Sequence, residues 1–481
     1  QPNLNGGKIA CLAQPICGSM PGRLVLGSFM QKFDSAKWLE DHPNIHNVRA
    51  VTFDINGVMR GKRLPIGQLK KAVNDGVRMP LSLVNLDIWG RDIANSKWVF
   101  ESGDADGGSR WTGRGPLPMT WTDRDAAMVP LCLTYNDGRL FDGDPRNVLA
   151  AVLDKFMARG LHPVAAFEME FYLADPTWHD GPAPETAASP LTGAVNIREG
   201  VLSVDDLNDH DSLLNDIYDC CGMQDVAADA AISEAGSGQF EINLLHGPDC
   251  LKVADDAVLF KQIAKGVARK HGLAASFMAK PYADRPGNGM HVHLSVIDQQ
   301  GHNIFDDGSE AGSQLMQHAV AGLLAAMPES MLIFAPHHNS YRRFAIESHA
   351  PLAACWGYEN RTAALRIPLG PPQQRRIEHR VAGADTNPYL VLATILAGVL
   401  AGLDWAKPAP PPIEGSAYDA ELPSLPVTWQ NAYEAFATGS VLGDLLPDVF
   451  RLMLLDCKAQ EMRRFAADIS AFEYQSYLDQ A

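Results

Sequence analysis

The chain has 481 residues, of which 46% are hydrophobic and 20% are charged. This balance is typical of a soluble globular protein and excludes a largely disordered chain, and the length favours about two or three domains. The formal net charge of −17 argues against a general binder of nucleic acids or anionic membranes, so we expect neither partner.

The first segment, residues 1–35, is interpreted as a leader or a poorly ordered region. It lacks the basic and then apolar pattern of a signal peptide. The eight cysteines form no pair of CxxC motifs, and Cys220 and Cys221 are adjacent in the chain. Because adjacent cysteines are poorly placed to form a disulfide, we expect free thiols in a reducing cytoplasm.

Residues 36–140 are predicted to form a small, mostly β domain. The segment 48–53 alternates like a strand and leads into the turn-forming sequence DING at 54–57. Strand character is also found at 78–86 and 126–134. These segments place the first sheet before the first strong helix signal.

Residues 141–481 are predicted to form a second domain. Asp144 is the predicted N-cap of its first helix, Pro145 follows at the first helical position, and the helix ends at Gly160. The apolar run in the helix at 388–403 is shorter than the roughly 18–20 residues that span a bilayer, so we interpret it as a buried core helix. Further helices are predicted at 252–271, 311–326 and 456–480, and a proline-rich extended connection at 407–412.

Four short segments carry ionisable side chains at alternate positions. In the first, Glu168 and Glu170 share one face of a strand, opposite an apolar face that must meet a core. The other three segments are GQFEINL at 238–244, MHVHLS at 290–295 and RIEHR at 376–380. A half-exposed strand explains each segment alone, whereas one shared cavity explains all four together.

Such a cavity would suit hard divalent cations. Its candidate ligands are five carboxylates and one imidazole, namely Glu168, Glu170, Glu234, Glu241, Glu378 and His291. Oxygen ligands favour Mg²⁺ or Mn²⁺ over structural zinc, and clustered carboxylates need cations to stay ionised. Six ligands suffice for two metal ions with three protein ligands each.

Arginines concentrate in the last third of the chain, although the chain is acidic overall. They are Arg342, Arg343, Arg361, Arg366, Arg375, Arg376 and Arg380. Guanidinium groups suit the oxygens of carboxylates and phosphates, and the chain lacks the spacing of a P-loop. The residues alone leave two alternatives open, which are two-metal phosphoryl transfer from ATP and two-metal hydrolysis.

Six motifs carry a resemblance to the glutamine synthetase superfamily. In chain order they read FEMEFYL, SEAGSGQFEINL, GNGMHVHLS, NSYRRF, ENRTAALRIP and RRIEHRVAGADTNPYL. Within the superfamily, the chain most resembles glutamate–amine ligases of the glutamate–putrescine type. The resemblance implies an α+β fold with a β-grasp N-terminal domain and a catalytic domain on a curved antiparallel sheet. It also implies a dodecamer of two stacked hexameric rings, with active sites between neighbouring subunits.

The resemblance assigns roles to individual residues. Glu170, Glu234 and Glu241 match the ligands of a first metal ion. Glu168, His291 and Glu378 match the ligands of a second metal ion near ATP. The substrate-binding positions are Gly287, Arg343 and Arg380, and the positions facing the nucleotide or its phosphates are His293, Ser295, Arg361, Arg366 and Arg376. The catalytic positions are Asp54, Arg343, His349 and Arg361.

The reaction implied by the resemblance has two steps. The γ-carboxylate of glutamate attacks the γ-phosphate of ATP and forms γ-glutamyl phosphate, and a nitrogen nucleophile then displaces phosphate. Activation is needed because a carboxylate oxygen is a poor leaving group, whereas phosphate held by metal ions and arginines leaves readily.

One departure from the superfamily pattern concerns the nitrogen donor. True glutamine synthetases carry a glutamate before Ala-Pro in the loop after NSYRR, and His349 stands there in this chain. The change removes part of a cage for ammonium. Asp54, which matches the aspartate that a neighbouring subunit offers to ammonium in the superfamily, is present, and Glu347 lies two residues from His349 as a candidate substitute. We therefore predict putrescine or another polyamine as the acceptor. The alternatives are a small monoamine (methylamine, isopropylamine or ethanolamine) and ammonium.

Three other positions receive interpretations. A diamine pocket needs a carboxylate or an aromatic wall for its distal ammonium, and Trp356, Tyr358 and Glu359 are candidates. Trp356 equally fits core packing. Tyr418 is interpreted as an exposed loop tyrosine rather than a modification site.

Overall fold

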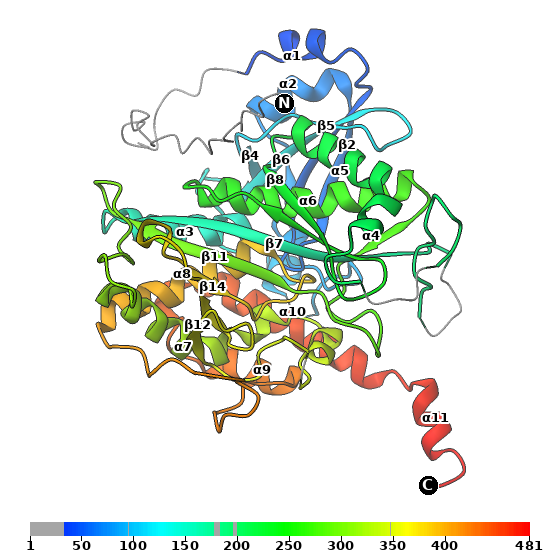
Figure 1. Ribbon diagram of the computed structural model, residues 1–481. Helices are drawn as coiled ribbons and strands as arrows, with labels where there is room; N and C mark the ends of the chain where they lie inside the picture. Colours follow the sequence, from blue (N-terminus) through cyan, green and yellow to red (C-terminus); the bar gives the residue numbers. More distant parts are fainter. Residues whose placement is uncertain (1–32, 95, 178–182, 196–199, 347) are drawn as a thin grey trace, which may run out of the picture.

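The computed structural model describes residues 33–94, 96–177, 183–195, 200–346 and 348–481 (Figure 1). Most of the predicted leader, together with Glu347, therefore lies outside the described residues. The short helix α1 (Ser35–Asp41) begins the described chain, and Asp34 caps it by accepting from two backbone amides. The six described cysteines are free, as predicted, and all six are buried.

The first sheet is built from residues 47–134 and has the order β2-β1-β6-β4-β3, with β5 paired to β6. β1 and β6 run parallel, and the other pairs are antiparallel. Helix α2 (Leu69–Asn74) follows the first hairpin. The strands are β1 (Asn47–Phe53), β2 (Met59–Pro65), β3 (Met79–Pro80), β4 (Asp106–Trp111), β5 (Leu117–Met119) and β6 (Ala126–Thr134).

Two of the three predicted strands in this region are confirmed, as β1 and β6. The strand predicted over 78–86 is wrong, because the strand there is limited to Met79–Pro80 and Leu81–Val84 form a 3-10 turn. Pro80 has no backbone N–H for a continuing ladder, and the apolar side chains of the turn are buried instead.

The second sheet has eight strands in the order β12-β13-β14-β11-β7-β9-β8, with β10 paired to β7. Its pairs are antiparallel except β12 with β13, which run parallel and so depart from the predicted antiparallel sheet. The strands are β7 (His162–Ala174), β8 (Ala228–Ser233), β9 (Gln239–Leu244), β10 (Ala274–Ser276), β11 (Met290–Ile297), β12 (Trp356–Tyr358), β13 (Leu365–Ile367) and β14 (Ile377–His379).

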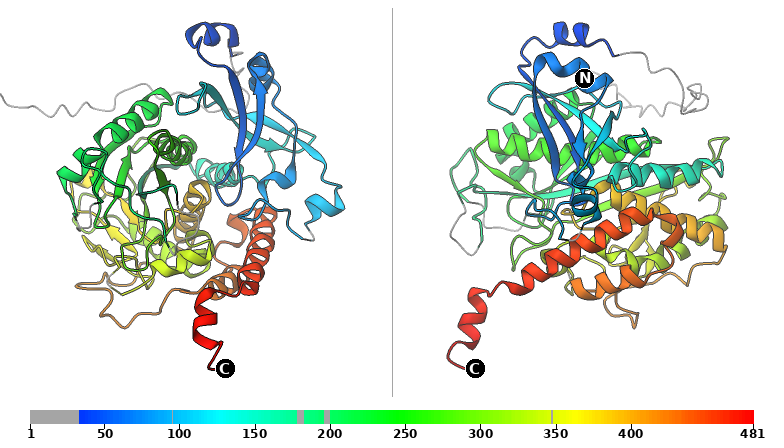
Figure 2. Two further views of the ribbon diagram at one scale, coloured as in Figure 1. Left: turned by 90° about the vertical axis from the view of Figure 1, so that its right-hand side faces the viewer. Right: turned by 180° about the vertical axis from the view of Figure 1, so that it is seen from behind.

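Helices pack against the apolar side of this sheet and against one another (Figures 1 and 2). At one contact, a Cβ on Gly402 would lie 2.0 Å from the carbonyl oxygen of His318, so glycine lets helices α7 (Gln314–Phe334) and α8 (Pro388–Trp405) approach closely. The helices are α3 (Pro145–Met157), α4 (Val204–Asp209), α5 (Asp211–Met223), α6 (Cys250–Lys270), α7 (Gln314–Phe334), α8 (Pro388–Trp405), α9 (Trp429–Thr438), α10 (Asp448–Ala467) and α11 (Ala471–Tyr477).

The predicted helices need two corrections. The helix expected at 311–326 runs on to Phe334, with Pro328 inside it. The single helix expected at 456–480 is two helices, because Ser470 caps α11 and the chain turns after α10. Figures 1 and 2 show α11 standing away from the body of the protein.

The predicted core helix is α8, which begins at the Asn387 cap. Among the described residues, it is the helix long and apolar enough to cross a membrane, and 83% of it is buried inside the protein.

Candidate active site

Strand register places the expected acidic and histidine side chains next to one another. Glu170 of β7 pairs with Glu241 of β9, and Glu168 pairs with His291 of β11 on the other side of β7. His293 of β11 in turn pairs with Glu378 of β14. One polar face of four adjacent strands therefore gathers residues that lie more than 200 positions apart in the chain.

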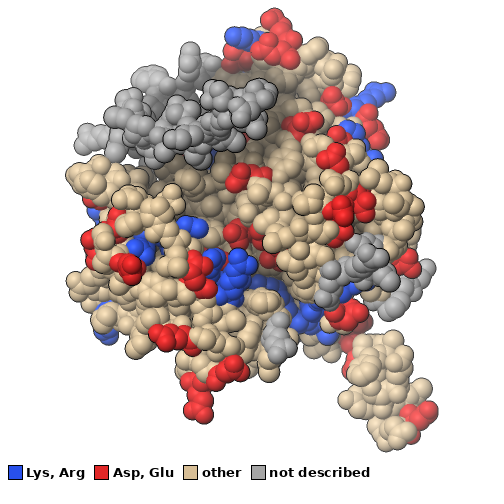
Figure 3. All heavy atoms as spheres, in the orientation of Figure 1, with Lys and Arg blue, Asp and Glu red and all other residues tan. Residues whose placement is uncertain are grey.

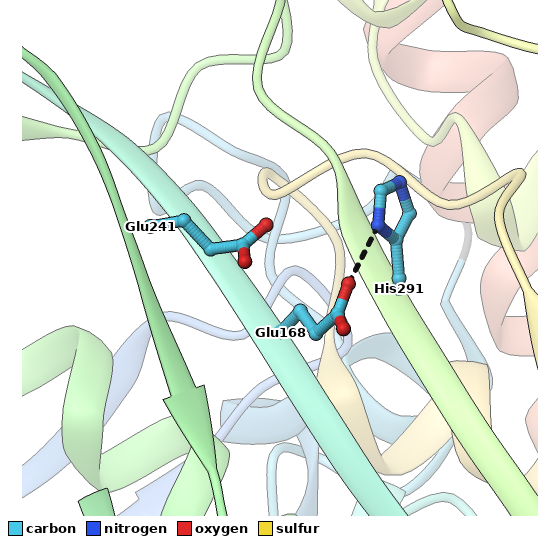
Figure 4. A group of neighbouring side chains, drawn as sticks. All are labelled: Glu168, Glu241 and His291. Atoms are coloured by element: carbon cyan, nitrogen blue, oxygen red, sulfur yellow. Dashed lines mark hydrogen bonds and ion pairs between the residues drawn. The ribbon is translucent and has the colours of Figure 1, made fainter. Parts of the chain in front are cut away.

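Two groups of side chains lie close enough to hold a metal ion. One is Glu168, Glu241 and His291, and the other is Glu168, His293 and Glu378, with the ligand atoms of each group within 4.8 Å of one another. Figure 4 shows the first group, whose side chains point toward one another from three strands. Glu168 belongs to both groups, because one of its oxygens lies 2.9 Å from His291 Nδ1 and the other 2.7 Å from His293 Nε2.

His293 lies in the second ligand group, a neighbourhood that the sequence did not predict. Its Nε2 lies 2.7 Å from Glu168, and the nucleotide contact implied by the resemblance stays a prediction. Arg376 also reaches it, with its Nε 3.1 Å from His293 Nδ1. The alternating HVH pattern of β11 was the signal in the sequence, since it sets both histidines on the same face.

The carboxylates divide into two classes by their electrostatic surroundings. Burial and the neighbouring carboxylates of Glu168, Glu170 and Glu234 raise the pKa of Glu241 to about 9. Burial and Glu170 likewise raise the pKa of Glu234 to about 7. Burial acts in the same direction on Glu168, but hydrogen bonds from the two histidines outweigh it and hold the pKa of Glu168 below its usual range. The donor set is rich in oxygen and carries excess negative charge, which fits a divalent cation.

These shifts predict a pH dependence of metal binding. Protons on Glu234 and Glu241 compete with the metal, so the affinity for Mg²⁺ should rise with pH across the range from about 6 to 9 and binding should release protons. Because both pKa values are raised above their unfolded value, the metal-free protein loses stability as pH rises through 7 and 9.

Mg²⁺ should therefore raise the melting temperature more at pH 9 than at pH 6. Titration calorimetry in buffers of different ionisation enthalpy measures the released protons, and thermal unfolding measures the stabilisation. Binding that is independent of pH would contradict this assignment of the protonated carboxylates.

Arginines line the side of the site formed by β13 and β14. Glu378 contacts Arg380 and lies 2.6 Å from Arg366. Burial raises the pKa of Glu378, but Arg380 and the two histidines outweigh burial and hold the pKa below its usual range. Arg366 also lies 2.7 Å from Glu359. In Figure 3, lysine and arginine side chains gather around a hollow near the centre of this face. The site therefore combines a cluster of carboxylates with a positive wall suited to anionic groups.

Arg343 is a buried guanidinium at the same site. It is 5% exposed and donates hydrogen bonds to the carbonyl oxygens of Val381, at 2.8 Å, and Arg380, at 3.3 Å. A Cβ on Gly287 would lie 2.9 Å from the Arg343 side chain, so the predicted glycine lies directly against this arginine.

Sequence reasoning missed Gly289. Its amide donates to Glu170 at 2.6 Å. An added Cβ there would lie 3.1 Å from each of Arg343, Glu170 and His291. The small residue before the histidine in GNGMH was the available signal, but close approach of three polar side chains depends on the tertiary structure.

Other predicted residues lie at the edge of this cluster or away from it. Arg361 is exposed, and its charge partly offsets the burial and the Glu170 carboxylate that raise the pKa of Glu234. His349 is exposed and has a backbone φ of +55°, and Ser295 is half-buried on β11. Asp54 lies in the turn after β1, where it is fully buried and 2.8 Å from Arg60. Burial raises the pKa of Asp54 to about 6, although Arg60 acts in the opposite direction.

Two aromatic side chains have partners of their own. Trp356 is buried and donates its indole N–H to Pro410, so the core-packing interpretation is confirmed. The interpretation of Tyr418 as exposed is wrong, because it is half-buried and its hydroxyl donates to the carbonyl oxygen of Ala350 at 3.1 Å.

Most of the chain matches a known protein family. The family described as "Glutamine synthetase, catalytic domain" matches residues 142–477. The chain belongs to the glutamine synthetase family. This membership confirms the predicted resemblance and the α+β, glutamine synthetase-like fold class.

Two curated members of the glutamine synthetase family show where this chain lies within it. Gamma-glutamylputrescine synthetase PuuA of Escherichia coli (strain K12) is 38% identical over 452 residues, covering 92% of this chain and 94% of that protein. Glutamate–isopropylamine ligase of Pseudomonas sp. is 30% identical over 453 residues, covering 92% and 96%. The solved structure of a GmaS/ADP complex matches with a TM-score of 0.79 at 25% identity, covering 93% of this chain and 99% of that chain.

Proposed function

We propose that this member of the glutamine synthetase family joins the γ-carboxylate of glutamate to an organic amine at the expense of ATP, with putrescine as the first candidate acceptor. The observation that carries the proposal is Glu168, which belongs to two candidate metal groups beside a wall of arginines. Similarity to gamma-glutamylputrescine synthetase supports putrescine, and similarity to glutamate–isopropylamine ligase supports a monoamine as the alternative.

Metal ions would be held by the two groups that share Glu168, with Glu170 and Glu234 beside them. Mg²⁺ or Mn²⁺ bound there would neutralise the charge of the triphosphate and polarise its oxygens. Arg361, Arg366 and Arg376 would bind phosphate oxygens and the nucleotide. Their guanidinium groups orient the γ-phosphate toward the substrate and balance the charge that develops during transfer.

Glutamate would be bound by Arg343 and Arg380 beside Gly287. Its γ-carboxylate oxygen attacks the γ-phosphorus of ATP, the bond to the bridging oxygen breaks and ADP leaves. The amine nitrogen then attacks the carbonyl carbon of γ-glutamyl phosphate, loses a proton and displaces phosphate. Asp54, offered by a neighbouring subunit, and His349 are the proposed acceptors of that proton.

Active sites shared between subunits require an oligomer, and we propose a homo-oligomer of the dodecameric type. Helix α11 supports this assembly, because it contains no buried residue and exposes the aromatic side chains of Phe472, Tyr474 and Tyr477. A seven-residue helix is not stable alone in water, so it needs a partner surface. A division into domains at 36–140 and 141–481, a cytoplasmic location and a role in polyamine catabolism complete the proposal.

The proposed function is tested by phosphate release from purified protein with glutamate and Mg²⁺-ATP. Putrescine, spermidine, methylamine, ethanolamine, isopropylamine and ammonium are supplied one at a time, and the product is identified by mass spectrometry. Turnover with amines and little turnover with ammonium is the expected result. Strong activity with ammonium alone would make the protein a glutamine synthetase and overturn the proposed acceptor.

His349 provides a separate prediction about the acceptor. His349→Glu adds a negative charge where the resemblance places the ammonium cage, so kcat/KM for ammonium should rise by about tenfold. The measurement is the ratio of kcat/KM for ammonium to that for putrescine. His302→Glu, at an exposed histidine elsewhere, is the matched control and should leave the ratio unchanged. An unchanged ratio in His349→Glu would contradict the role given to this position.

A further inference from the structure

A buried ion pair on α10 has no role in the site described above. Lys458 and Glu461 are both 0% exposed and lie one turn apart, with Lys458 Nζ 2.8 Å from Glu461 Oε2. Burying two charges is costly, and an apolar pair of similar size is often at least as stable. Stability alone therefore does not explain this pair, and its other contacts indicate what it holds.

Both charged groups hold the side-chain amide of Asn56. Lys458 Nζ donates to Asn56 Oδ1 at 2.6 Å, and Asn56 Nδ2 donates to Glu461 Oε1 at 3.2 Å. Glu461 Oε1 also accepts from the amide of Ile88 at 2.8 Å. The two ends of the Asn56 amide are thus fixed by opposite charges from a helix about 400 residues further along the chain.

Asn56 belongs to the turn that carries Asp54. The amides of Asn56 and Val58 each donate to Asp54 Oδ1 at 2.9 Å, and Arg60 Nε lies 2.8 Å from the other carboxylate oxygen. Gly57 completes the turn with a φ of +72°, a conformation that favours glycine. The direction of the Asp54 carboxylate therefore depends on the turn that α10 holds through Asn56.

We propose that Lys458 and Glu461 are positioning residues which, through Asn56, hold Asp54 in the orientation that the amine step requires. This inference rests on the proposed function, in which Asp54 serves the amine bound to a neighbouring subunit. Neither residue touches a substrate. Their effect should appear in the amine step and not in the binding of ATP or glutamate.

Gln460, also on α10, provides a control that distinguishes positioning of Asn56 from simple attachment of α10 to the rest of the protein. Gln460 binds the 86–94 segment, through Asp87 at 2.9 Å, the Asp92 carbonyl at 3.0 Å and the Ala94 amide at 2.7 Å. It makes no side-chain hydrogen bond to Asn56, a residue that the structure describes, but it anchors the same helix to the same part of the chain. Gln460→Leu is therefore a matched control that weakens attachment of α10 without releasing the Asn56 amide.

The test compares the Lys458→Met/Glu461→Met double variant with Gln460→Leu and Asp54→Asn. The double variant removes both charges without leaving one unpaired. We expect kcat/KM for putrescine to fall by about tenfold or more in the double variant and in Asp54→Asn. The KM values for ATP and glutamate, and the slow ADP formation without amine, should stay within about twofold of the unchanged protein. Gln460→Leu should leave all these values unchanged.

The outcomes distinguish this inference from the proposed function. If Asp54→Asn has no effect on the amine step, the proposed role of Asp54 fails and the inference fails with it. If Asp54→Asn impairs the amine step and the double variant does not, only the positioning role is overturned. If kcat/KM falls equally for ATP, glutamate and putrescine in the double variant, the ion pair has a general structural role and the proposed positioning role is also overturned. Should the double variant not fold, Asn56→Ala makes the same comparison with both charges still paired.

Discussion

Glu168→Gln is expected to reduce amine-dependent phosphate release by about 10³-fold or more, the largest effect of any single substitution considered. Glu168 is shared by both candidate metal groups and bridges His291 and His293. Removing its charge weakens both groups at once. Steady-state kinetics at saturating Mg²⁺ and a calorimetric Mg²⁺ titration measure the two consequences.

The matched control for this substitution is Glu434→Gln, at an exposed glutamate on α9. It changes the net charge by the same amount and should leave both measurements unchanged. A Glu168→Gln protein that keeps more than about a tenth of the activity and binds Mg²⁺ normally would contradict the shared-ligand assignment.

Arg343→Lys is expected to lower kcat/KM for glutamate by about 100-fold while keeping the positive charge. The buried guanidinium donates to two backbone carbonyl oxygens, at Val381 and Arg380, and lies against Gly287. A lysine ammonium cannot reproduce this planar fork and bind a substrate carboxylate as well. Initial-rate kinetics with glutamate varied at saturating ATP and putrescine provide the measurement.

Arg342→Lys tests whether the effect of Arg343→Lys is specific to the buried position. Arg342 is the exposed neighbour in the same NSYRRF motif, so the chemical change is identical and the environment is not. Its kinetics should remain unchanged. If kcat/KM for glutamate fell by similar factors in the two variants, the loss in Arg343→Lys would come from a general effect of lysine in the motif and not from substrate binding by Arg343.

The local pattern of the polar strands was readable from the sequence. Alternation in β7, β9, β11 and β14 places glutamate and histidine side chains on one face, as predicted. The order of the strands was not readable, because register depends on contacts between distant segments. The pairing of Glu168 with His291, and with it the shared position of Glu168, therefore comes from the structure.

Other features depended on packing that no local pattern records. The segment at 78–86 has an apolar composition typical of a strand, yet its burial in the core of the first sheet is achieved by a 3-10 turn. The C-terminal helix signal continues through 468–470, but Ser470 and Glu473 form a capping box that starts a new helix. The contacts of Lys458 and Glu461 with Asn56 join opposite ends of the chain and have no sequence signature.

The most direct test of the two-step account follows the oxygens of glutamate. Glutamate labelled with ¹⁸O at both oxygens of its γ-carboxylate is incubated with Mg²⁺-ATP and putrescine, and the released phosphate is analysed by mass spectrometry. The account predicts that each phosphate carries one ¹⁸O from glutamate and that the other stays in the new amide. Phosphate without the label would show that ATP is cleaved without a γ-glutamyl phosphate and would contradict the account.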